Sequence, residues 1–181
     1  KEVSKHDVLY IHVTLIPFIS AAGELKTKPT QHSVKELRSI GIQPDILVCR
    51  TEQELSKDMK EKLALFCDVD ADAVIQNMTA STIYEVPLMM QKEGLDKIVL
   101  EKLEMDYRPA HMEEWERMVH RIKNPANKVK IAVVGKYVEL PDAYKSIREA
   151  LVLGAAHYDY HLELHYLQAD KIDESNIMQK M

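Results

Sequence analysis

The sequence predicts an α/β protein in which helices cover a parallel β-sheet. Short runs rich in β-branched residues alternate along the chain with segments in which apolar residues recur at helical spacing. Glycine and proline separate several of these runs, for example between Gly41 and Pro44. Strands that alternate with helices in this way usually pair in parallel, with the helices packed against the faces of the sheet.

The first part of the chain is expected to contain three strands, at residues 9–17, 45–50 and 73–76. The 9–17 run is rich in β-branched residues and is interpreted as a buried strand. A helix is expected to begin near Ser33, because Ser33 and Glu36 have the spacing of a capping box.

Two further helical segments are expected in this part of the chain. Residues 56–66 place the apolar side chains of Met59, Leu63 and Phe66 on one helical face. Residues 87–103 also have a helical pattern, and Gly94 is expected to break it.

The organisation changes after residue 108. Pro109 and the Asn-Pro-Ala-Asn run at 124–127 bracket a predicted helix at 112–122, which contains the only tryptophan, Trp115. The pattern then predicts one βαβ unit, with a strand at 129–134, a turn at Gly135, a helix at 142–154 and a strand at 162–166. The predicted divisions are residues 1–108, a linker at 109–127 and residues 128–181.

Composition narrows the class of protein. The chain has a hydrophobic content of 46% and a net charge of −5, so it is expected to be globular and not a general binder of nucleic acid. Cys49 and Cys67 are too few for a disulfide framework, and their apolar neighbours predict buried thiols in a cytoplasmic protein. No apolar run has membrane-spanning length. The first residues resemble neither a signal peptide nor an initiator, so the chain is expected to begin within a longer protein.

Two lysines and two hydroxyls are concentrated just before the predicted helix, in the segment 26–31. A helix N-terminus carries partial positive charge and unpaired N–H groups, so Lys26 and Lys28 are unfavourable there unless an anion is bound. The segment therefore predicts a phosphate site. The alternative is a basic, solvated loop that happens to precede a helix.

The same segment carries a resemblance to a known family. Residues 23–37, continued by 41–47, closely resemble the amidoligase domain of the CTP synthase family, and residues 134–146 resemble the opening of the family's glutamine amidotransferase domain. The resemblance covers essentially the whole chain, while the chain covers only a middle part of the family's length. It implies a partial, P-loop-type amidoligase domain, a linker helix and the first βαβ unit of a glutaminase.

In the family, ATP phosphorylates UTP at the base oxygen, and ammonia from glutamine then displaces the phosphate to give CTP. The resemblance assigns UTP and CTP binding to Lys26, Thr27, Lys28, Pro29, Thr30, Gln31 and Lys62. It assigns ATP binding to Arg50, Met78, Thr79 and Ala80, although the family usually has a basic residue followed by Asp-Val at the last three positions.

Lys145 and Glu149 are assigned to activation by GTP. Lys145 is expected in the first turn of a helix capped by Asp142, where the helix dipole disfavours a cation, and Lys before Glu is the weaker order for a pair one turn apart. The placement is therefore poorly explained by stability alone. The alternative is an ordinary exposed pair.

The family's other functional groups are not expected in this segment. The chain has no glycine-rich phosphate loop, and both cysteines precede the 129–134 strand, so neither corresponds to the glutaminase nucleophile. No catalytic residue or metal ligand is predicted here, and Mg²⁺ should be held with ATP by residues outside the segment. The resemblance also implies a cytoplasmic homotetramer. Two alternatives remain open: a non-catalytic module that senses pyrimidine nucleotides, and a fragment that acts only in assembly.

His157, His161 and His165 recur every four residues, as they would on one face of a metal-binding helix. However, Leu162, Leu164 and Tyr166 alternate with polar residues, and this pattern favours a strand. A metal site is therefore not expected.

Overall fold

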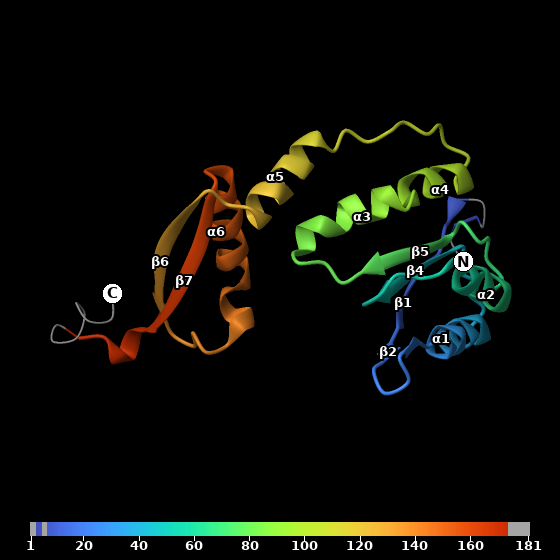
Figure 1. Ribbon diagram of the computed structural model, residues 1–181, viewed down its shortest axis with the longest axis horizontal. Helices are drawn as coiled ribbons and strands as arrows, with labels where there is room; N and C mark the ends of the chain where they lie inside the picture. Colours follow the sequence, from blue (N-terminus) through green and yellow to red (C-terminus); the bar gives the residue numbers. More distant parts are fainter. Residues whose placement is uncertain (1–2, 5–6, 174–181) are drawn as a thin grey trace. The chain divides into compact units, whose positions relative to one another are not determined.

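The structure is a computed structural model that describes residues 3–4 and 7–173. It divides into two compact units, Lys1–His111 and Met112–Met181 (Figure 1). The first unit contains β1 (Ile11–Ile16), β2 (Phe18–Ile19), β3 (Glu24–Leu25), α1 (Lys28–Ser39), β4 (Ile46–Thr51), α2 (Lys57–Cys67), β5 (Val74–Met78), α3 (Val86–Lys92) and α4 (Leu95–Lys102). The second contains α5 (Glu113–Lys123), β6 (Asn127–Gly135), α6 (Lys145–His157) and β7 (Tyr160–Gln168).

The main sheet of the first unit is parallel, with strand order β1-β4-β5. Helices α1 and α2 cover one face, and α3 and α4 lie over the other (Figure 1). The core accordingly has two layers. Leu47, Cys49 and Val74 pack with Leu63 of α2 on the first face, while Ile46, Val48 and Ile75 pack with Ile98 of α4 on the second. The predicted α/β class with a parallel sheet is confirmed.

Strand β1 is buried on one side only, so the prediction of a buried strand at 9–17 is wrong for its other side. Thr14 and Ile16 are buried, whereas Ile11, Val13 and Leu15 are 42%, 59% and 56% exposed. Among the described residues β1 pairs only with β4, and the helices of the second face pack over β4 and β5. The outward side of β1 therefore has no helix over it in this part of the chain.

Helix α1 begins five residues earlier than the capping-box prediction. Thr27 is its N-cap residue, and Pro29 lies in its first turn, where the fixed φ of proline suits a helix start. Ser33 lies inside the helix, and its Oγ is 2.8 Å from Nε2 of His12 on β1. The expected cap at Ser33 is wrong because this hydroxyl is used in packing the helix against the strand.

The other helices of the first unit follow the predicted pattern with one exception. Ser56 caps α2 by accepting a hydrogen bond from the Met59 N–H, and Gly94 separates α3 from α4 with a φ of +77°. However, Phe66 is 57% exposed. The buried face of α2 continues from Leu63 to Cys67, four residues on, and this turns Phe66 away from the core.

The second unit contains the predicted βαβ unit. Strands β6 and β7 pair in parallel and α6 connects them. Residues 141–144 form a 3-10 turn in which the Tyr144 hydroxyl donates a hydrogen bond to the Lys136 carbonyl oxygen at 2.7 Å. This turn delays α6, so its N-cap residue is Tyr144, and the prediction that Asp142 caps the helix is wrong. None of the helices among residues 3–4 and 7–173 is long and apolar enough to cross a membrane.

Candidate functional site

Three parts of the predicted ligand site lie at one edge of the first unit's sheet. They are residues 26–31, Arg50 and residues 78–80. The register places Ile16, Thr51 and Met78 side by side, and these residues end β1, β4 and β5. We call this row the carboxyl edge. In open parallel sheets, ligands bind outside the carboxyl ends of the strands. The carboxyl edge is therefore where a ligand site is expected on physical grounds.

The segment from Lys26 to Gln31 follows β1 by way of a short hairpin. Strands β2 and β3 pair in antiparallel fashion, and Gly23 in their turn has a φ of +65°. The Lys26 N–H then donates to the Pro17 carbonyl oxygen at 3.0 Å, which ties Lys26 to the end of β1. Lys28 is exposed and is the first residue of α1. The two lysines thus flank the start of a helix that begins at the carboxyl edge.

The hydroxyl and amide side chains of this segment are bonded within the fold. Thr30 is fully buried, and its hydroxyl accepts a hydrogen bond from Thr14 at 3.1 Å and donates to the Leu15 carbonyl oxygen at 3.2 Å. The Gln31 amide donates to Oγ1 of Thr27, which is itself buried. An anion at this helix start would therefore meet the two lysine side chains and the first-turn backbone N–H groups.

Lys62 on α2 is close enough to the β2–β3 hairpin for its charge to act on Glu24. Glu24 forms an ion pair with Lys26. The hydrogen bond and the charge of Lys26 hold the pKa of the Glu24 carboxyl below its usual range, and the charge of Lys62 lowers it further. Helix α2 therefore places Lys62 where its charge acts on Glu24, and no local sequence pattern indicates this.

Glu24 should compete with an anionic ligand for Lys26. UTP and CTP are the ligands that the sequence resemblance implies for this segment. If they bind there, Glu24→Gln is expected to tighten their binding by roughly two- to fivefold, because it removes a carboxylate that neutralises Lys26 at the surface. Titration calorimetry would measure the affinity. Glu101→Gln is the matched control, since it removes an equal charge from the exposed pair with Lys97 on α4. Weaker binding of both nucleotides by Glu24→Gln would show that the carboxylate contributes to the site instead.

The residues assigned to ATP lie farther along the carboxyl edge. Arg50 is exposed and lies between Leu15 and Asn77 in the register of the sheet. Thr79 follows the last residue of β5, and its N–H donates to the Thr51 carbonyl oxygen at 2.9 Å. The backbone at this position is thus fixed by the sheet and does not depend on which side chain Thr79 carries.

Asn77 is a residue that the sequence interpretation missed. It is the register partner of Arg50, so the two side chains lie on the same face of the sheet. Its Oδ1 is buried and has no hydrogen-bond partner among the described residues. An unpaired buried amide oxygen is unfavourable unless a donor reaches it. No motif marks this position; only the pairing of β4 with β5 reveals it.

In the second unit, Lys145 is the first residue of α6 and is exposed. Glu149 lies one turn later, and its Oε1 is 3.8 Å from Nη1 of Arg148. The structure thus confirms that Lys145 stands at a helix start, the position at which the helix dipole disfavours a cation.

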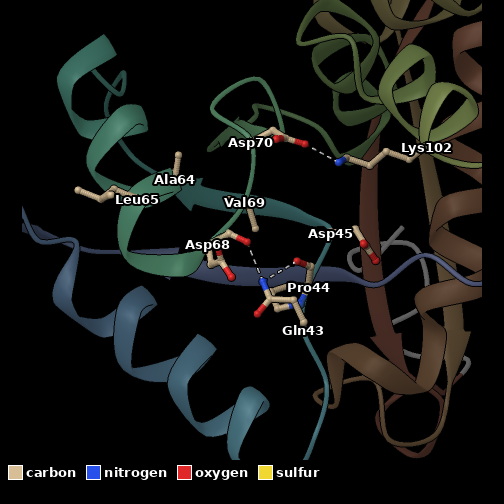
Figure 2. Close-up of a pocket in the computed structure, with 9 residues that line it drawn as sticks. All are labelled: Gln43, Pro44, Asp45, Ala64, Leu65, Asp68, Val69, Asp70 and Lys102. Carbon is tan, nitrogen blue, oxygen red and sulfur yellow. Dashed lines mark hydrogen bonds and ion pairs between the residues drawn. The ribbon is translucent and has the colours of Figure 1, made fainter. Parts of the chain in front are cut away.

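A separate pocket of about 380 Å³ opens at the opposite end of the first unit's sheet. Figure 2 shows the residues that line it, which are Gln43, Pro44, Asp45, Ala64, Leu65, Asp68, Val69, Asp70 and Lys102. The Gln43 amide donates to the carbonyl oxygens of Pro44 and Asp68, and Lys102 forms an ion pair with Asp70 at 2.7 Å. None of the residues predicted to bind a nucleotide lines it, and several of its polar groups are bonded within the fold.

The cysteines and histidines have no arrangement that favours chemistry. Burial raises the pKa of Cys49 to about 12 and also raises the pKa of Cys67, so both remain protonated thiols. His157 ends α6, whereas His161 and His165 lie on β7, which confirms the strand prediction. Within residues 3–4 and 7–173, no three His, Cys, Asp or Glu side chains are grouped as metal ligands.

Comparison with known proteins shows which family this chain resembles in sequence. A family model described as CTP synthase N-terminus matches residues 1–105. The CTP synthase of Methanocaldococcus jannaschii is 58% identical over 173 residues, which is 96% of this chain and 32% of the relative. Those of Ruminiclostridium cellulolyticum and Moorella thermoacetica are each 54% identical, over 97% and 98% of this chain and 33% of each relative. The chain thus spans about a third of the length of the curated relatives that it matches.

Proposed function

Because the chain belongs to the CTP synthase family, we propose that it forms part of an enzyme that converts UTP to CTP. In this proposal ATP supplies the phosphoryl group that activates UTP, and glutamine supplies the ammonia. One observation supports the assignment most directly: Lys26 and Lys28 flank the start of α1 at the carboxyl edge, so two cations and the helix N-terminus are available to one anion. The segment itself carries the binding functions and is not proposed to catalyse the reaction alone.

The triphosphate of UTP or CTP is proposed to lie at the start of α1. The ammonium groups of Lys26 and Lys28 would pair with phosphate oxygens, and first-turn N–H groups would donate to them. Thr27, Pro29, Thr30 and Gln31 would give this helix start its shape, and Lys62 would add a third positive charge. Calorimetric titration of UTP and CTP into the protein tests the proposal. The proposal is overturned if the protein binds neither nucleotide.

ATP is proposed to bind along the carboxyl edge near Arg50. The Arg50 guanidinium would face the phosphates of ATP. Backbone groups of Met78, Thr79 and Ala80 would contact the adenine base. The hydrogen bond that fixes Thr79 to Thr51 supports a backbone role, because it holds this segment in place whatever the side chains are. These positions offer no carboxylate, and the described residues contain no cluster suited to a metal ion. Mg²⁺ would therefore reach the site with ATP and be held by groups outside this segment.

Lys145 and Glu149 are proposed to serve activation by GTP. In the intact enzyme, we expect Lys145→Ala to reduce GTP stimulation of glutamine-dependent CTP formation roughly fivefold or more, while sparing the reaction driven by free ammonia. Steady-state rates with each nitrogen source would measure this. Lys136→Ala removes an equal charge from another exposed position of the second unit and is the control. Equal loss of both reactions would indicate a folding defect, and full stimulation in both Lys145→Ala and Glu149→Ala would overturn the assignment.

Two other functions lead to different results. A nucleotide-sensing module would bind UTP and CTP without belonging to an active enzyme, and an assembly fragment would associate with a CTP synthase without binding nucleotide itself. The mass of the native protein and its rate of CTP formation separate these cases.

The proposal also includes a cytoplasmic location and a homotetramer with Lys62 near a site completed by another subunit. Sedimentation as a monomer at all nucleotide concentrations would exclude the tetramer.

A further inference from the structure

The side of β1 that faces α1 carries two polar residues where apolar packing is usual. His12 and Thr14 alternate with Ile16 on this side, and Thr14 is only 9% exposed. Polar groups are unfavourable at a buried helix–sheet contact unless they are hydrogen-bonded. Both are bonded, and both partners, Ser33 and Thr30, belong to α1. The contact between β1 and α1 therefore contains two specific polar pairs.

The two pairs fix the position of α1 along β1. Thr14 on the strand bonds to Thr30 on the helix, and His12, two residues earlier on the strand, bonds to Ser33, three residues later on the helix. The two elements run in opposite directions, so the pairs join them at two separate points along their length. Side chains two apart on a strand share a face, as do side chains three apart on a helix. A shift of α1 along its axis would break both hydrogen bonds. Apolar contacts alone are non-directional and would resist such a shift less.

Thr30 is the most constrained of these residues. Its hydroxyl is fully buried, accepts from Thr14 and donates to the Leu15 carbonyl oxygen, one residue before the end of β1. Thr30 lies two residues after Lys28. The side chain that anchors the helix to the strand is therefore within one helical turn of a lysine proposed to bind phosphate.

The spacing of the two lysines depends on this anchor. Lys26 is tied to the end of β1 by the hydrogen bond from its N–H to the Pro17 carbonyl oxygen, whereas Lys28 moves with α1. We propose that the Thr14–Thr30 and His12–Ser33 pairs position the nucleotide site by holding Lys28 at a fixed height relative to Lys26. This inference rests on the proposed function. It makes Thr14, Thr30, His12 and Ser33 positioning residues that need not touch the ligand.

Substitutions that remove one hydroxyl and keep the volume test the inference. We expect Thr30→Val and Thr14→Val each to weaken UTP and CTP binding by about tenfold, measured by calorimetry where every variant is folded. Thr30→Ser keeps the hydroxyl and should bind within about twofold of the unsubstituted protein. The double variant should be little worse than either single one, because the two hydroxyls act as one unit. Ser33→Ala removes the second pair at a partly buried position and supplies a milder variant if the valine substitutions prevent folding.

Two controls separate positioning from a general loss of stability. Ser39→Ala removes a hydroxyl that donates to the Glu36 carbonyl oxygen at the far end of α1, and it should leave affinity unchanged. Ile75→Ala should lower stability through the core on the other face of the sheet without changing affinity. Unchanged affinity in folded Thr30→Val, Thr14→Val and Ser33→Ala would overturn the inference. If the unsubstituted protein binds neither UTP nor CTP, the proposed function itself fails, which is a distinct result.

Discussion

Replacing Lys26 or Lys28 with alanine should weaken the binding of UTP and CTP by about 10- to 100-fold, the effect expected when one charged hydrogen-bond partner is lost. The two lysines flank the start of α1, where the helix N-terminus adds to their positive potential. Neither substitution removes a buried side chain from the core. Affinity measured by calorimetry should fall while the far-ultraviolet circular dichroism spectrum stays the same.

The salt dependence of binding makes this test more specific. Each lysine that pairs with phosphate should contribute to the decline of affinity with ionic strength, so each alanine variant should show a shallower decline. Lys35→Ala is the matched control because Lys35 is exposed on the same helix beyond its first turn and carries the same charge. If all three variants bind with the affinity of the unsubstituted protein, the helix start is not the phosphate site.

Leu63→Ala should lower the free energy of unfolding of the first unit by about 2–5 kcal/mol, since it leaves a cavity in the core beneath α2. Leu63 is fully buried and packs in the cluster that contains Leu47, Cys49 and Val74. Leu65 is the matched control. It is the same residue type on the same helix but is 79% exposed, and Leu65→Ala should change stability by less than about 0.5 kcal/mol.

Urea denaturation followed by two probes would measure the difference. Circular dichroism reports helices of both units, whereas Trp115, the only tryptophan, lies on α5 in the second unit. Leu63→Ala should shift the circular dichroism transition to lower urea. Equal effects of the two leucine substitutions would contradict the burial of this face of α2.

The fold class could be predicted because its signals are local. The break at Gly94 and the strand at 162–166 were each predicted from a few neighbouring residues, and the structure contains both. The start of α1 was predicted wrongly because two local signals compete there. Pro29 and the Ser33–Glu36 pair both resemble helix starts. In the structure the helix begins at the proline, and the Ser33 hydroxyl instead contacts His12, which lies 21 residues away in the sequence.

The candidate site was less accessible to local interpretation. The motif around Lys26 and Lys28 is continuous in the sequence, so it could be recognised directly. The proximity of Lys62 to Glu24 results from the packing of α2, and the pairing of Asn77 with Arg50 results from the sheet register. The exposure of Phe66 depends on whether α2 buries position 66 or 67, and a difference of one residue is beyond the resolution of a periodic pattern.

The exposed side of β1 also limits how the protein can be handled. Ile11, Val13 and Leu15 place three apolar side chains along a strand that, among the described residues, pairs on one side only. Such a strand is a template on which other chains can add, so we expect concentrated samples of this 181-residue chain to aggregate. Self-association would consume protein during a titration and would imitate weak binding. The substitution Val13→Lys would interrupt the apolar row at its centre. Charged residues on an exposed strand oppose the addition of another chain to its edge.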